Sequence, residues 1–141
     1  MAVLVRRALC IPFLWCLAIA PALIGQERWV LVHEDVLQRI YLDTLSLQAG
    51  TDSASYTGWF KYSFRERQKL DSLYYVMMMA RSEVDCRKRR SRLYELAFYD
   101  SLGHNLRHHG QSEPLAWQNL IPTSAGEDAM ITGCRVYARK S

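Results

Sequence analysis

The sequence lacks the short motifs on which several enzyme classes depend. It contains no G-x-S-x-G nucleophile elbow, no H-E-x-x-H zinc motif and no motif of paired carboxylates. It has only seven glycines, and they form no glycine-rich loop for phosphate. No internal repeat, low-complexity stretch or linker divides the chain. We therefore expect a single domain that is not an enzyme and that binds no cofactor or metal.

The first 25 residues have the pattern of a secretory signal peptide. Arg6 and Arg7 precede an apolar run that ends near Ile24, and small residues suited to signal peptidase lie near positions 22 and 25. Two prolines interrupt this run, which makes it a poor membrane anchor, because a spanning helix needs about 20 apolar residues. We expect cleavage near 22 or 25, leaving residues 26–141 as the exported domain. Loss of the two arginines lowers the net charge from +4 to about +2, so the mature chain is not strongly basic.

Cysteine is scarce, and its positions are informative. Of the four cysteines, Cys10 and Cys16 would leave with the signal peptide, so Cys86 and Cys134 are the only thiols of the mature chain. In an oxidising compartment, two such thiols most simply form a disulfide. Closing a loop of about 48 residues would stabilise the fold by roughly 4 kcal/mol on the chain-entropy model.

Hydrophobic patterning predicts a sheet of consecutive strands. The predicted strands are residues 28–33, 40–42, 56–64, 73–86, 91–99 and 104–109. Residues 48–53 are rich in turn formers, and the charged stretch 65–71 is interpreted as a loop. Residues 73–86 fit either a strand or a helix, and we favour a strand because a basic turn and a returning strand would complete a hairpin.

Near the C-terminus the spacing of apolar residues changes from that of a strand to that of a helix. Ser124 precedes Glu127 by three positions, which is a capping box in which the serine accepts from the Glu127 backbone and the glutamate reaches back. Apolar residues then recur at helical spacing at Met130, Cys134 and Tyr137, with Ile131 and Ala138 beside them. These patterns predict an amphipathic helix of about 12 to 14 residues. The fold class is α+β: a small antiparallel sheet of about five to six strands packed by a C-terminal helix.

The ordered set of marks along the chain resembles the bacterial surface-adhesin protein E-like domain family. The marks are Trp29, Tyr41-Leu42-Asp43-Thr44 with Ser46, Trp59, Asp85-Cys86 followed by Arg89, Arg90 and Arg92, Tyr99-Asp100 with Gly103, Trp117, Pro122, Gly126-Glu127 and Cys134. The resemblance implies a small exported α+β domain with a disulfide between Cys86 and Cys134. It also implies a binding role at the surface or in the periplasm, since the family's named member is an adhesin for host matrix and serum proteins.

A basic cluster is the sharpest local signal within this set. It consists of Arg87, Lys88, Arg89, Arg90 and Arg92, on the predicted hairpin turn and the strand after it. Such a cluster could contact a polyanion or another partner. Alternatively, it is a solvated turn whose charges discourage aggregation at a sheet edge.

The remaining marked side chains are interpreted as structural. They are Trp29, Trp59, Tyr99, Trp117, Ser124 and Glu127. Aromatic side chains also anchor binding surfaces, but we expect Trp117 to fill the core beneath the segment that leads to the helix. His104 and His108 share one face of a strand at about 13 Å, which argues against a metal site that also includes His109.

Two functions stay open. One is an adhesin-like domain that binds a macromolecule, such as a host matrix or serum protein or a polyanion. The other is a periplasmic structural or accessory protein without a host ligand. In both cases we expect an exported protein of the periplasm or outer surface, without specific nucleic-acid binding and without a membrane span after cleavage.

Overall fold

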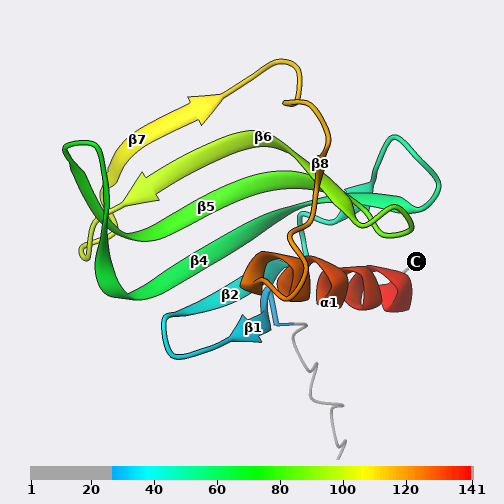
Figure 1. The fold of residues 1–141 in the computed structure, drawn as a ribbon, viewed down its shortest axis with the longest axis horizontal. Helices are drawn as coiled ribbons and strands as arrows, with labels where there is room; N and C mark the ends of the chain where they lie inside the picture. Colours follow the sequence, from blue (N-terminus) through cyan, green and yellow to red (C-terminus); the bar gives the residue numbers. More distant parts are fainter. Residues whose placement is uncertain (1–26, 141) are drawn as a thin grey trace, which may run out of the picture.

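The fold is an antiparallel sheet with one helix against one of its faces (Figure 1). The computed structural model describes residues 27–140, so the predicted signal peptide at 1–25 lies outside the described residues. The elements are β1 (Trp29–Glu34), β2 (Gln38–Asp43), β3 (Gln48–Ala49), β4 (Ser55–Leu70), β5 (Leu73–Asp85), β6 (Arg90–Tyr99), β7 (Asn105–Gly110), β8 (Gln118–Asn119) and α1 (Ala125–Lys140). The main strand order is β1-β2-β4-β5-β6-β7. The predicted α+β class and the favoured strand at 73–86 are confirmed.

The core lies between α1 and the end of the sheet that the helix covers. Alternate residues of β4, among them Tyr56 and Phe60, are fully buried there. They pack with buried residues of β2 and β5 and with Ala129 and Met130 of α1. Because α1 lies mainly against β1 and β2, it covers only part of this face (Figure 1).

The helix begins with the predicted cap. Ser124 Oγ accepts from the Glu127 backbone N–H at 3.1 Å. The Glu127 carboxylate, however, accepts from the Thr123 N–H at 2.8 Å instead of from Ser124, whose own N–H donates to the Ile121 carbonyl. The helix has 16 residues, slightly more than predicted. Met130 is buried, and Cys134 and Tyr137 pack against the core, as predicted, but Ala138 is exposed. Ala129 and Gly133 are also buried in this stripe.

A disulfide joins α1 to the end of β5, as predicted. Cys86 and Cys134 are bonded, with their Cα atoms 6.0 Å apart. Cys86 follows the last residue of β5, and Cys134 packs against the buried core. The bond therefore holds the middle of the helix on the sheet.

The interpretation of residues 65–71 as a loop is wrong. Strand β4 continues to Leu70 and pairs with β5 up to the turn, after a register shift between Ser63 and Gln68. The hairpin bends at this shift, so that Tyr75 meets the ring of Phe98 on β6 at 4.8 Å. Backbone pairing holds this charged segment in a strand. The strand tolerates the charges since most of these side chains are exposed to solvent. Among residues 27–140, no helix is long and apolar enough to cross a membrane.

Candidate functional site

The face of the sheet opposite α1 is the broadest candidate binding surface. Side chains alternate along each strand, so this face carries the residues between the core positions. We define the uncovered face as Trp29, Leu31, Tyr41, Trp59, Lys61, Met77, Met79, Arg81, Glu95 and Tyr99, which the strand register places on one side. The one helix of the described residues lies on the other side. Leu31 is exposed and the rest are half-buried, as expected for large side chains packed sideways on an open sheet.

Lys61 lies at the centre of an aromatic cluster on the uncovered face. Its Nζ is 4.5 Å from the centroid of the Trp29 ring and 4.7 Å from that of Tyr41. Both distances are within the range of cation–π attraction. Trp29 therefore belongs to a surface cluster, and sequence reasoning missed Lys61, whose role depends on the register of three strands.

Arg81 is a second cation on this face, and one of its N–H groups lacks a hydrogen-bond acceptor among the described residues. The Arg81 guanidinium lies 4.8 Å from the Tyr94 ring centroid, and its Nε is 2.7 Å from Glu95 Oε1. The contact has the distance of an ion pair, but the angle is too poor for a hydrogen bond, so the buried Nε has no hydrogen-bond partner among the described residues.

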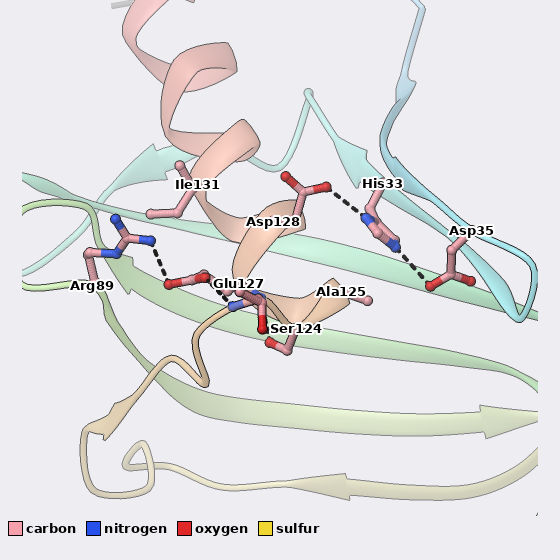
Figure 2. Close-up of a pocket in the computed structure, with 9 residues that line it drawn as sticks. His33, Asp35, Arg89, Ser124, Ala125, Glu127, Asp128 and Ile131 are labelled. Carbon is pink, nitrogen blue, oxygen red and sulfur yellow. Dashed lines mark hydrogen bonds and ion pairs between the residues drawn. The ribbon is translucent and has the colours of Figure 1, made fainter.

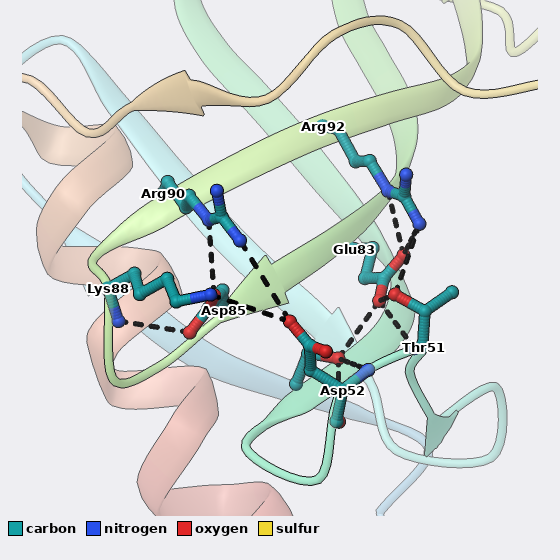
Figure 3. A network of polar contacts seen from close by, with 8 residues as sticks. Thr51, Asp52, Glu83, Asp85, Lys88, Arg90 and Arg92 are labelled. Atoms are coloured by element: carbon teal, nitrogen blue, oxygen red, sulfur yellow. Dashed lines mark hydrogen bonds and ion pairs between the residues drawn. The ribbon is translucent and has the colours of Figure 1, made fainter.

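The basic cluster is largely neutralised by neighbouring carboxylates (Figure 3). Arg90 Nε donates to Asp85 Oδ2 at 3.1 Å, and Lys88 Nζ is 3.9 Å from the same oxygen. Arg89 pairs with Glu127 at 2.6 Å and so connects the turn to α1. Arg87 is exposed and is the one member of the cluster without an ion pair in the described part of the chain. Most of these cations therefore stabilise the turn.

Glu83 is the buried centre of this polar network. Its side chain is fully buried, and Oε2 accepts two bonds from Arg92, at 2.7 and 2.9 Å. Oε1 accepts from the Thr51 N–H at 2.6 Å and from the hydroxyls of Thr51 and Ser55 (Figure 3). Burial alone raises the pKa of Glu83, but the bonds from Thr51, Arg92 and Ser55 outweigh it and lower this pKa to about 2.

Sequence reasoning assigned no role to Glu83. The predicted hairpin between residues 73–86 and 91–99 brings Glu83 close to Arg92, and the structure pairs these two residues. The register of the hairpin was therefore the signal that could have identified the pair.

Trp117 lies at the surface, so its expected place in the core is wrong. The Cζ atoms of Arg90 and Arg92 are each 4.5 Å from its ring centroid, and the side chain is half-buried. The segment before α1 runs along the edge of β6, where the Leu115 N–H bonds to the Leu93 carbonyl. This route leaves the ring stacked on the two arginines. Trp59 and Tyr99 also lie outside the buried core cluster, on the uncovered face.

A cavity of about 400 Å³ opens at the start of α1, beside His33 (Figure 2). His33 Nδ1 is 2.7 Å from Asp128 Oδ2, and Nε2 is 3.0 Å from Asp35 Oδ2. The hydrogen bond to Asp128, followed by that to Asp35, raises the pKa of His33 above its usual 6.5. The imidazole thus ties β1 to the first turn of the helix.

Two of the three other histidines form separate contacts. His104 is 3.0 Å from Asp100, and His108 is 3.3 Å from Glu95. No group of three or more metal-binding side chains comes together within residues 27–140.

One family model and two solved structures match this chain. The sequence model of the family described as Surface-adhesin protein E matches residues 29–135. A solved structure of Haemophilus influenzae protein E is 14% identical, with 86% of this chain and 94% of that chain covered and a TM-score of 0.55. A second crystal form of that protein is 15% identical, with 85% and 97% covered and a TM-score of 0.55. At these identities the structures show a shared fold, and no curated protein matches the chain.

The matched segment extends from the first residue of β1 to the residue after Cys134. It therefore contains the whole sheet, both cysteines of the disulfide, the uncovered face and the basic cluster. The chain belongs to the Surface-adhesin protein E family.

Proposed function

We propose that this chain is an exported, adhesin-like domain of the bacterial cell envelope that binds a macromolecular partner and catalyses no reaction. Membership of a surface-adhesin family supports the general class. The uncovered face is the observation that carries the proposal. It is a wide surface on rigid strands, held in place from behind by the core and the disulfide.

The composition of the uncovered face suits binding between macromolecules. Trp, Tyr and Arg are the residues that most often dominate the energetics of protein interfaces. Here Trp29 and Tyr41 flank Lys61, and Trp59 lies two positions before it on the same face of β4. Arg81 lies next to Trp59 across the β4–β5 pairing. Met79 adds an adaptable apolar side chain beside Lys61. Because the strands fix these positions, little ordering is required when a partner binds.

The strongest polar network supports a structural role and not catalysis. A catalytic carboxylate needs a pKa near its working pH and an accessible face. Glu83 has neither, because it is fully buried and its pKa lies at about 2. Asp85 is also buried and accepts from Arg90 and from the Lys88 N–H.

The basic cluster would be a secondary contact for a polyanion. Arg87 is unpaired in the described part of the chain, and Lys88 is held only by contacts of 3.9 Å to Asp85 and Asp52. Two mobile surface cations give weak, salt-sensitive attraction. The main partner would therefore bind at the uncovered face, and the turn would add to its affinity.

Labelling of intact cells tests the proposal. Antibodies against the mature domain, or protease added to intact cells, should reach an adhesin without permeabilisation of the outer membrane. Purified mature domain should also capture a macromolecular partner. Labelling only after permeabilisation, together with capture of an envelope protein, would favour the alternative of a periplasmic accessory protein.

A further inference from the structure

We propose that Lys61, with Trp29 and Tyr41, is a carboxylate-binding subsite that anchors an acidic, otherwise apolar, extended segment of a protein partner. This inference rests on the proposed function and names the chemistry of the partner at the same surface. It is carried by the surroundings of Lys61, the register of the strands beside it and the charge balance of the uncovered face.

Two aromatic rings restrict the ammonium group of Lys61, but its N–H groups have no acceptor among the described residues. The rings of Trp29 and Tyr41 restrict it at 4.5 and 4.7 Å, and the side chain is half-buried. An ammonium group has three N–H donors, yet within residues 27–140 Lys61 has neither an ion pair nor a hydrogen bond. A half-buried cation without an acceptor gains most from a carboxylate, because a charge-assisted hydrogen bond is about twice as strong as a neutral one.

The neighbours of Lys61 in its row across the sheet are apolar or aromatic. The register places Leu31 beside Tyr41, Tyr41 beside Lys61, and Lys61 beside Met79. Leu31 is 45% exposed, so its apolar side chain is accessible to a partner at one end of this row. Adjacent strands are about 4.8 Å apart, so this row is roughly 14 Å long, the length of about four extended residues. An extended segment with apolar residues on either side of one carboxylate matches the row.

The charge balance favours an acidic protein segment over a polyanionic glycan. The other cations on or beside this surface have carboxylate partners. Arg81 is 2.7 Å from Glu95, and Arg28, whose Cζ is 5.6 Å from the Trp29 ring centroid, is 3.1 Å from Asp43. Lys61 is the one positive charge on the uncovered face without a carboxylate partner among the described residues. A polyanion needs several cations without carboxylate partners along its length. On the uncovered face a single carboxylate is enough to pair with Lys61.

Selection from a displayed library of random nonapeptides tests the inference directly. Immobilised mature domain should enrich peptides that carry Asp or Glu between apolar residues. The K61M variant, which keeps the length and packing of the side chain, should not enrich them. Lys69→Met is the matched control, because Lys69 also lies against a ring, 5.5 Å from the Tyr74 centroid, but at the β4–β5 hairpin tip. Thermal melting must show that both variants are folded.

The strongest selected peptide then gives the quantitative result. Replacing its acidic residue by the amide should weaken binding by roughly tenfold or more for the wild-type domain, and should have little effect for K61M. Enrichment of peptides without an acid, no enrichment, or equal enrichment by K61M would overturn the inference. Heparin binding that depends on Lys61, or a dimer that sedimentation detects for the wild type and not for K61M, would overturn it as well.

This experiment is independent of the test of the proposed function. Capture of a partner that persists unchanged in K61M would leave the adhesin-like function standing and reject the subsite. Peptide selection that depends on Lys61, in a domain that antibodies and protease never reach on intact cells, would support the subsite and reject the adhesin-like function.

Discussion

Gly133 lies directly against the hydroxyl of Tyr56, so closely that a Cβ at position 133 would overlap this oxygen. The same hydroxyl donates to the Met130 carbonyl at 3.1 Å, which ties β4 to the helix backbone. Burial raises the pKa of Tyr56, so the hydroxyl stays protonated and able to donate. The absence of a side chain at Gly133 therefore sets how closely α1 approaches the sheet.

Gly133→Ala should destabilise the domain. The added methyl group must displace the Tyr56 side chain, and overpacking of this kind costs about 1–3 kcal/mol, partly offset by up to about 1 kcal/mol of helix propensity. Urea unfolding of the wild type and the variant measures the difference. Gly126→Ala is the control within the same helix, because its nearest neighbouring atom would be 3.8 Å away. In a Tyr56→Phe background the cost of Gly133→Ala should shrink, and an unchanged cost would contradict the assigned contact.

Removal of the disulfide should lower stability without changing the fold. Cys86 and Cys134 are 48 positions apart in the sequence, and the chain-entropy model gives a stabilisation of roughly 4 kcal/mol for a loop of this size. The double alanine variant should therefore unfold at a much lower urea concentration than the oxidised wild type. Reduction of the wild type should reproduce the effect, whereas reductant should not alter the variant.

Local patterns predicted the elements whose signal lies in the nearby sequence. The Ser124–Glu127 cap and the following helix depend on residues three and four positions apart. The disulfide followed from the small number of cysteines. The position of Trp117 could not be derived in this way, because it depends on the path of residues 111–119 along the edge of β6. Likewise, the strand character of residues 65–70 comes from backbone bonds to distant segments, from Arg65 to Leu37 and from residues 68–70 to β5, and not from composition.

The candidate site was less predictable than the fold, for a related physical reason. The marked Trp29 belongs to the uncovered face, but its partners Lys61 and Tyr41 come from two other strands. Their contact depends on the pairing register of the strands. A shift of one residue would turn the side chains of a strand to the opposite face of the sheet. The basic cluster was visible in the sequence, and Glu83 and Asp85, which pair with Arg92 and Arg90, lie in the same hairpin. Glu127, which pairs with Arg89, is distant in the chain and could not be assigned to the cluster from the sequence.

The buried Glu83 predicts acid sensitivity. Its pKa in the folded state, about 2, lies below its usual value of 4.5. The stabilisation is therefore complete above pH 4.5 and is lost as the pH falls towards 2, because protonation removes the negative charge that pairs with Arg92. Urea unfolding between pH 7 and pH 2 should show this loss. Glu83→Gln should be less stable at pH 7, since an amide cannot replace the bidentate ion pair, and should lose less stability on acidification. An equal acid sensitivity in both proteins would contradict this assignment.

The basic cluster predicts weak retention on a polyanion that depends on two residues. Arg87→Ser with Lys88→Ser should abolish retention of the mature domain on immobilised heparin at low salt, since Arg89, Arg90 and Arg92 are already paired. Raising the salt concentration should also elute the wild type early. The same pair of changes should leave thermal stability nearly unchanged, because both side chains are exposed. Unchanged retention in the double variant would rule out this contact.

His33 predicts a loss of stability on the alkaline side of neutrality. The protonated imidazole bridges Asp128 of α1 and Asp35 of the β1–β2 turn, and these bonds raise its pKa above 6.5. A raised pKa means that the stabilisation is complete below pH 6.5 and disappears as the pH rises through the pKa of the folded state. The other charged groups at this cavity, Arg89 and Glu127, pair with each other.

Unfolding free energies measured from pH 5.5 to pH 9 should therefore decline for the wild type above pH 6.5. His33→Gln keeps hydrogen-bonding capacity but cannot be charged, so its stability should not decline in this range, and the two curves should converge at high pH. Asp128→Asn should reduce the slope, because it removes the stronger of the two carboxylate contacts. Hydrogen exchange should place the change in the first turn of α1, where Asp128 lies, while the part of the helix held by Cys134 stays protected. Parallel curves for the wild type and His33→Gln would show that the bridge does not respond to pH.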